Sequence, residues 1–303
     1  MRRPVAASDG RATVRGRARV ALLLVLATAC GGERDAGAGS GGPRPPSVPV
    51  VGEVAPLPGG AVARVNGVRF DVTLAPGLPP PEPGTSLVRL DVELCAGAAR
   101  LRVDPAFWLG LGRDGAVYSA HSGVQGLLTF TLAPGTCQRG DVDIAVDDGV
   151  GLEEVLLMGL ERTTVARWSV GGDPVPPEEP LDSGLTPLTV ELGSEVRLAA
   201  GAAVTLRGFD PASDDGPSFR LEVEVCAGES QLQVGPRSWL LQLADHRLIV
   251  PDPDGGTLRT GSVEPGGCQQ GEMVFVQTSD ADAVAVIYTA DGAYEEARWS
   301  LVA

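Results

Sequence analysis

Five cysteines carry the most definite chemistry in this chain of 303 residues, and four of them form a repeat. Cys95 and Cys137 are each followed 131 positions later by another cysteine, Cys226 and Cys268. In a chain with an export signal such thiols are usually oxidised in pairs, so we expect one disulfide in each half. Zinc is the alternative, but two cysteines per half without a repeated histidine do not supply its four ligands. We therefore predict no metal site.

The two histidines do not extend the repeat. His121 and His246 lie 125 positions apart, so they occupy different places in the two copies. Ser119, His121 and an aspartate could be imagined as a hydrolase triad, but no Gly-x-Ser-x-Gly elbow accompanies them. All 24 basic residues are arginine, which excludes lysine nucleophiles and Schiff bases. We predict no catalytic residue and no cofactor, and keep a secreted hydrolase as a remote alternative.

Carboxylates cluster in several places and could offer oxygen ligands to calcium outside the cell. None of the clusters has the full spacing of an EF-hand loop, and aspartates beside turns commonly bond their own backbone instead. We favour turns and keep calcium as the alternative. The clusters are Asp141 with Asp143, Asp147 with Asp148, Asp214 with Asp215, and Asp252 with Asp254.

The N-terminus has the parts of a bacterial export signal. Six arginines within residues 1–19 precede an apolar run at 20–29, which is too short to span a bilayer as a stable helix. The run ends in Leu-Ala-Thr-Ala before Cys30, which resembles a lipobox, whose cysteine becomes the acylated first residue. We predict a lipoprotein signal peptide at residues 1–29 and lipidation, including palmitate, at Cys30. An ordinary secreted protein with a leftover cysteine is the alternative.

The charge of the chain restricts its partners. The formal net charge is −15, which argues against nucleic acid and against electrostatic attachment to anionic lipid. The expected membrane contact is the lipid bilayer through acylated Cys30. The expected location is the cell envelope, at the outer membrane or cell surface.

Composition divides the chain after the signal peptide into four segments. Residues 30–58 are rich in Gly, Ser and Pro and predict a disordered tether. Residues 59–170 and 188–303 are the two predicted domains. Residues 171–187 are Pro-rich and acidic, so we expect a semi-extended linker that keeps the domains separately mobile.

Both domains show the period of two that is typical of β-strands. Residues 88–94 (VRLDVEL) alternate apolar and polar side chains, and residues 219–225 (FRLEVEV) repeat the pattern. Each predicts a strand with one buried and one wet face. Further short apolar runs separated by Pro-Gly and Asp-Gly turns predict a β-sandwich in each domain. Upstream of these strands, Val62 and Gly67 are aligned with Val196 and Gly201.

Four tryptophans recur with the same spacing as the cysteines. They are Trp108, Trp168, Trp239 and Trp299. Repeated aromatic residues on strands usually pack in the core or on a sheet face, which is our prediction here. A platform on which a ligand stacks is the alternative.

Several segments resemble a family of bacterial exported domains of unknown function that is common in lipoproteins. The resemblance covers both domains and implies a tandem pair of immunoglobulin-like β-sandwiches without catalytic residues. The matching segments are residues 90–93, 107–115 and 134–140, then 221–224 and 265–271.

The duplicated scaffold lacks a duplicated reactive group. We therefore expect a non-catalytic, membrane-anchored lipoprotein whose tandem modules display loops to a protein or glycan partner. A passive structural spacer of the envelope is the alternative.

Overall fold

The computed structural model describes residues 48–74, 80–121, 126–171, 179–198, 201–211, 218–276, 279–289 and 293–302. The predicted signal peptide, Cys30, the tether up to residue 47 and the Asp214–Asp215 pair lie outside the described residues. Ser47–Ala303 forms one compact unit. Within the described ranges, no helix is long and apolar enough to cross a membrane.

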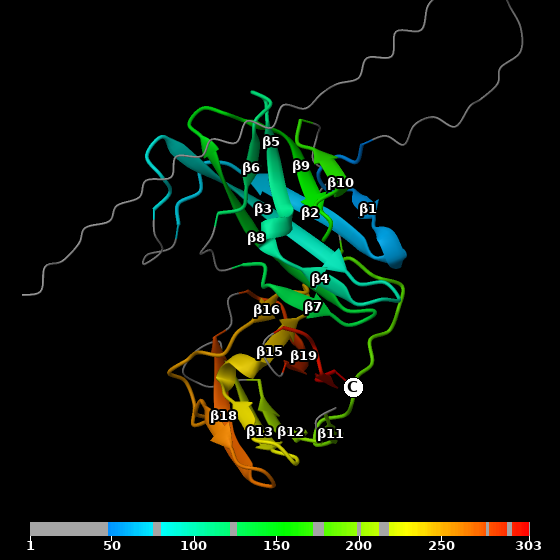
Figure 1. The fold of residues 1–303 in the computed structure, drawn as a ribbon, viewed down its shortest axis with the longest axis vertical. Helices are drawn as coiled ribbons and strands as arrows, with labels where there is room; N and C mark the ends of the chain where they lie inside the picture. Colours follow the sequence, from blue (N-terminus) through cyan, green and yellow to red (C-terminus); the bar gives the residue numbers. More distant parts are fainter. Residues whose placement is uncertain are drawn as a thin grey trace, which may run out of the picture. The chain divides into compact units, whose positions relative to one another are not determined.

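Residues 48–171, which we call module one, form a sandwich of two antiparallel sheets (Figure 1). One sheet has the strand order β1-β2-β3-β8, the other has the order β10-β9-β5-β6, and a β4-β7 ribbon accompanies them. The strands are β1 (Val54–Pro56), β2 (Val62–Arg69), β3 (Thr85–Cys95), β4 (Leu101–Val103), β5 (Trp108–Gly112), β6 (Val117–Ser119), β7 (Phe130–Leu132), β8 (Cys137–Asp147), β9 (Leu152–Met158) and β10 (Thr164–Ser169).

Residues 188–302, which we call module two, repeat this plan strand for strand. The sheets have the orders β11-β12-β13-β18 and β16-β15-β19-β20, and β14-β17 is the ribbon. The chain is therefore an all-β protein with two β-sandwich modules. The strands are β11 (Glu195–Arg197), β12 (Ala203–Asp210), β13 (Ser218–Cys226), β14 (Leu232–Val234), β15 (Trp239–Leu243), β16 (Leu248–Ile249), β17 (Gly261–Val263), β18 (Cys268–Val276), β19 (Ala283–Tyr288) and β20 (Ala297–Ser300).

The second strand of each module corrects the alignment derived from sequence. Val62 pairs with Cys95 in module one, and Ala203 pairs with Cys226 in module two. The partner of Val62 is therefore Ala203, not Val196. Both strands also have a bulge just before a glycine, Gly67 and Gly208. The sequence alignment was wrong here because it matched β2 with β11, and the length difference falls in the loop after the second strand.

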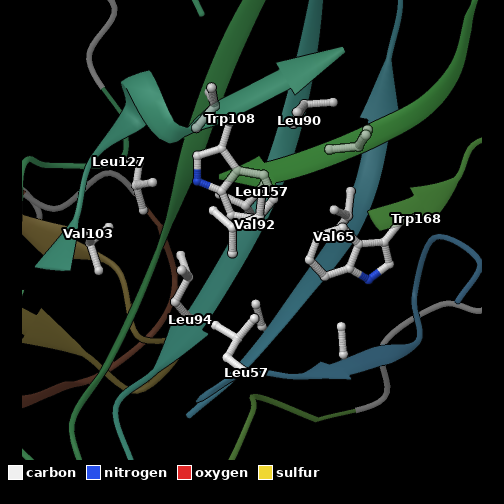
Figure 2. Close-up of a cluster of buried hydrophobic side chains, with 14 of the residues drawn as sticks. Leu57, Val65, Leu90, Val92, Leu94, Val103, Trp108, Leu127, Leu157 and Trp168 are labelled. Atoms are coloured by element: carbon white, nitrogen blue, oxygen red, sulfur yellow. The ribbon is translucent and has the colours of Figure 1, made fainter. Parts of the chain in front are cut away.

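Each core is centred on a pair of stacked tryptophans. The ring centroids of Trp108 and Trp168 lie 5.7 Å apart, and those of Trp239 and Trp299 lie 5.8 Å apart. All four side chains are fully buried. Figure 2 shows Trp108 beside Leu157 in the core of module one. Stacked rings at this distance add to the free energy of apolar burial.

The N-terminal boundary of module one lies earlier than predicted. β1 falls inside the predicted tether, yet it pairs with β2, and the Ser169 amide donates to the Pro49 carbonyl at 2.8 Å. The tether prediction for residues 48–58 is therefore wrong. The reason is that an edge strand tolerates proline, here Pro56, so a Pro-rich composition hid a short strand.

The predicted linker is also partly fixed to module one. Residues 179–187, which we call the connector, place Leu181 in a buried cluster with Cys95 and Cys137. The Glu179 carbonyl accepts a hydrogen bond from Arg64 Nη2 at 2.8 Å. The expectation of separately mobile domains fails for this part of the chain, because these contacts hold it against β2 and β3.

Candidate functional site

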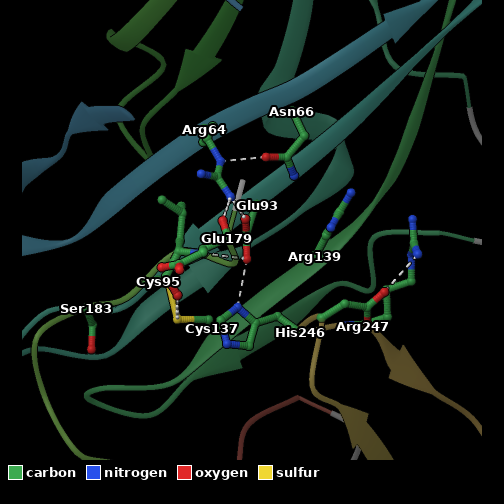
Figure 3. A network of polar contacts seen from close by, with 12 residues as sticks. Arg64, Asn66, Glu93, Cys95, Cys137, Arg139, Glu179, Ser183, His246 and Arg247 are labelled. Carbon is green, nitrogen blue, oxygen red and sulfur yellow. Dashed lines mark hydrogen bonds and ion pairs between the residues drawn. A yellow bond between two sulfur atoms is a disulfide. The ribbon is translucent and has the colours of Figure 1, made fainter. Parts of the chain in front are cut away.

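The most buried charge in the described structure is Glu93, near the end of β3. Its carboxylate has no exposed surface and accepts from Arg64 Nη2 at 2.7 Å. The Leu181 amide donates to the same carboxylate at 3.0 Å, and His246 Nδ1 lies 2.7 Å from it. Figure 3 shows Arg64 of β2 and His246 of the β15–β16 turn on different sides of Glu93. Elements from both modules and the connector therefore meet at one side chain.

A second carboxylate two residues earlier extends this cluster. Asp91 makes a bidentate pair with Arg139, at 2.8 and 2.6 Å, and lies 3.9 Å from Arg247 Nη2. The Arg139 amide donates to the His246 carbonyl at 2.9 Å. Gln242 Nε2 donates to the Cys137 carbonyl at 2.7 Å. The β15–β16 turn of module two is thus hydrogen-bonded to β8 of module one.

These contacts shift the pKa values of the carboxyl groups. Burial raises the pKa of Glu93, but hydrogen bonds from His246, the Leu181 amide and Arg64 outweigh it, so the pKa is lowered from its ordinary value. The pKa of Asp91 is also lowered, because its pair with Arg139 outweighs burial. Burial dominates at Asp141 and raises its pKa. Glu93 and Asp91 are therefore stabilised as anions inside the cluster.

The corresponding glutamate of module two has a different environment. Glu224 occupies the position of Glu93 in the repeat, but it keeps 18% of its side-chain surface exposed and pairs with Arg207. β13, which carries Glu224, alternates buried and more exposed residues as the sequence predicts. The last four residues of β3 are all buried, because the connector and the β15–β16 turn cover its second face.

Both predicted disulfides are confirmed. Cys95 is bonded to Cys137 and Cys226 to Cys268. The first is buried beneath Leu181, whereas Cys268 of the second is exposed. His246 has a ring nitrogen within 4.8 Å of the sulfurs of Cys95 and Cys137, but sulfur in a disulfide is no thiolate ligand for a metal. Because disulfides persist in oxidising compartments, they indicate an exported protein.

The other residues considered for chemistry lie apart from this cluster. Ser119 ends β6, and the His121 amide donates to the Asp143 carbonyl at 2.7 Å. Asp143 itself pairs with Arg89 at 2.7 Å. Asp252 Oδ1 accepts from the Asp254 amide at 3.0 Å, which is the turn geometry predicted for this pair. The structure brings His246, not His121, to a buried carboxylate.

An apolar groove of about 370 Å³ lies on module one and is lined by Leu94, the neighbour of Glu93 on β3, but by no residue of the Glu93 cluster. This volume is within the range of roughly 300–1,000 Å³ that is typical of small-molecule pockets. The groove runs between β4 and the β9–β10 turn. We call it the module-one groove, and its lining comprises Leu57, Pro58, Leu94, Arg100, Leu101, Arg102, Phe107, Leu157, Met158, Gly159, Leu160, Glu161, Thr163 and Val165.

A second depression of about 350 Å³ shares Arg100 with this groove and follows the connector. Leu188 lines it and is 93% exposed, which makes it the most exposed large apolar residue in the described ranges. Leu185 and Pro134 line the same depression. We call the exposed apolar residues Pro134, Leu185 and Leu188 the connector surface.

Comparison with known proteins leaves the family open. No protein-family model matches the chain, and no curated protein matches its sequence. Among solved structures, the secreted protein MPT63 of Mycobacterium tuberculosis is similar at 15% identity and a TM-score of 0.32, over 38% of this chain and 98% of its own. An uncharacterized β-sandwich protein of Clostridium difficile is similar at 11% identity and a TM-score of 0.25, over 39% and 99%.

Proposed function

We propose that this protein is a non-catalytic lipoprotein of the bacterial cell envelope that binds a protein partner through the connector surface. Acylation of Cys30 would hold it at the outer membrane or cell surface, and its two immunoglobulin-like modules would present the binding surface. The observation that carries the proposal is the exposure of Leu188 beside Leu185 and Pro134. Apolar side chains exposed together commonly mark a site of protein contact.

The apolar character of this surface favours a protein over a glycan. Glycans are polar and need hydrogen-bonding groups, whereas exposed leucines gain free energy when a partner's apolar side chains cover them. The contacts between the modules also support binding, since module one, the connector and module two contribute Pro134, Leu185 and Leu188 to a surface that is formed before the partner binds.

Site-specific photocrosslinking in cells tests the proposal. A photoreactive amino acid at position 188 should give one discrete crosslinked product, and a charge introduced next to it by Leu185→Asp should abolish that product. Position 117 on β6 is the matched control, because Val117 is also exposed but lies outside the connector surface. Equal products from positions 188 and 117, or none from either, would contradict partner binding through this surface.

A passive spacer is the second candidate, and the docking of the two modules is the observation that favours it. A spacer needs fixed length but no specific surface. A protein carrying Leu185→Asp or Leu188→Asp would then still restore the wild-type phenotype when it is expressed in a deletion strain. Intact mass spectrometry of the membrane-extracted protein, with Cys30→Ser as control, tests the lipid anchor separately from either role.

A further inference from the structure

We infer that the module-one groove binds a single-chain amphiphile with an anionic head, of the fatty-acid carboxylate class. The alkyl chain would lie against the apolar floor of the groove, and the carboxylate would pair with Arg102 and Arg100 at its rim. This inference goes beyond the proposed protein partner and does not depend on it.

The groove has an apolar floor and a solvent-facing cationic rim. Leu57, Leu94 and Leu157 are buried and form the floor. Figure 2 shows Leu57 and Leu94 close together at one end of the core of module one. Phe107 and Met158 are half-buried in the lining, whereas Arg100 and Arg102 are exposed. An occupant that satisfies both parts needs an apolar body and a head that stays near water.

The charge of the rim selects an anion. Arg100 and Arg102 are the two cations of the lining, and Glu161 on the β9–β10 turn is its one carboxylate. Among the described residues, Arg102 makes one long ion pair of 3.7 Å, to Asp104, and Arg100 stacks over the Tyr294 ring at 5.4 Å. A long ion pair between an exposed arginine and a partly exposed aspartate is weak, so the guanidinium of Arg102 can bind a ligand carboxylate at little cost. Arginine also matches a carboxylate with two parallel hydrogen bonds.

Module two shows that the fold does not require this lining. The repeat places Gln231 and Gln233 where module one has Arg100 and Arg102. Gln231 donates to Glu264 at 3.0 Å and Gln233 donates to Ser262, so in module two both side chains form hydrogen bonds at the protein surface. The cationic rim is therefore a property of module one and not of the sandwich.

The walls of the groove also differ between the modules, because two apolar residues of module one are replaced by hydroxyl residues in module two. Ser238 stands at the position of Phe107 and Thr289 at that of Met158, and Thr289 is hydrogen-bonded to the Ser238 carbonyl. The floor keeps its apolar character, since Val225 stands at the position of Leu94.

The lining favours an alkyl chain over a peptide. The floor consists of side chains that cannot hydrogen-bond, so a peptide backbone placed there would lose its bonds to water without replacement. An alkyl chain has no such groups. Leu160, which is 75% exposed on the β9–β10 turn, can cover the chain from the solvent side.

The test uses the full chain with Cys30→Ser, purified without detergent so that the groove is not filled during preparation. Isothermal titration calorimetry measures binding of decanoate, decyltrimethylammonium and decyl maltoside below their micelle concentrations. We expect decanoate to bind at one site, and the other two at least about tenfold more weakly, since one charge-assisted pair has about this effect.

Substitutions taken from module two are the matched variants. Arg102→Gln should weaken decanoate binding by about tenfold while leaving the melting temperature unchanged, because Arg102 is exposed. Met158→Thr should weaken all three probes. Arg197→Gln, at an exposed arginine of module two, should change neither measurement.

A photoreactive decanoate analogue locates the site independently of affinity. Its adducts should map to residues 157–165. Equal binding of the anionic and cationic probes, unchanged affinity in Arg102→Gln, or adducts elsewhere would each overturn the inference. Failure of decanoate to bind would overturn it as well and would leave the protein-partner proposal standing.

Discussion

Replacement of Glu93 by glutamine should destabilise the protein much more than the same replacement of Glu224. Glu93 is completely buried and joins Arg64, His246 and the Leu181 amide. Glutamine keeps one acceptor oxygen but removes the charge, which leaves Arg64 without its anion. Removing one partner of a buried ion pair costs about 3–5 kcal/mol. We expect Glu93→Gln to lower the free energy of unfolding by this amount.

Glu224→Gln is the internal control, because Glu224 has the same position in the copied sandwich. Its pair with Arg207 is partly exposed, and pairs of this kind contribute about 0–1 kcal/mol. Equilibrium urea unfolding with the disulfides intact, followed by the fluorescence of the buried tryptophans, measures both variants. If the two substitutions lower the free energy of unfolding equally, the buried cluster does not hold the modules as we argue.

Three further predictions concern acid, reduction and packing. The folded-state pKa of Glu93 is lowered, so its contribution to stability is complete above its unfolded pKa of about 4.3 and disappears as the pH falls through the folded value. Urea unfolding between pH 7 and pH 3 should therefore show that acidification lowers the free energy of unfolding less in Glu93→Gln than in the wild type. Parallel plots of this free energy against pH for the two proteins would refute the prediction. The disulfide of module two should be reduced before that of module one, because one of its sulfurs belongs to an exposed residue. Alkylation at successive times of reduction, followed by mass spectrometry, measures the order. Reduction of the module-one disulfide first would show that burial does not protect it. A Cβ on Gly97 would lie 2.4 Å from the Gly59 carbonyl oxygen, so Gly97→Ala should destabilise by about 1–3 kcal/mol, while Gly67→Ala points into open space and should have a smaller effect in thermal melts.

Strand identity could be predicted because period-two patterning is a local property of the chain. The 219–225 run alternates along β13 as expected, and Trp239, one of the four repeated tryptophans, begins β15. The disulfides followed from spacing and export. β1 could not be found in the same way, because three residues at a sheet edge carry no alternation and include Pro56.

The buried cluster could not be predicted because it depends on contacts between distant segments. Glu93 and Glu224 stand in near-identical local sequences, and nothing nearby distinguishes the buried one from the exposed one. His246 lies 153 residues away from Glu93 and meets it only in the folded structure. One part of the groove could have been noticed in the sequence, because the aligned repeat shows Gln233 at the position of Arg102.

Two apolar side chains of module two, Leu240 and Ile287, belong to the buried core of module one. The copies therefore share part of one hydrophobic interior, and their stabilities are coupled. A protease that cut the chain between residues 171 and 179 would leave the two fragments associated, so a nicked molecule would still migrate as an intact particle under native conditions. Either module alone would expose apolar surface that the other now covers.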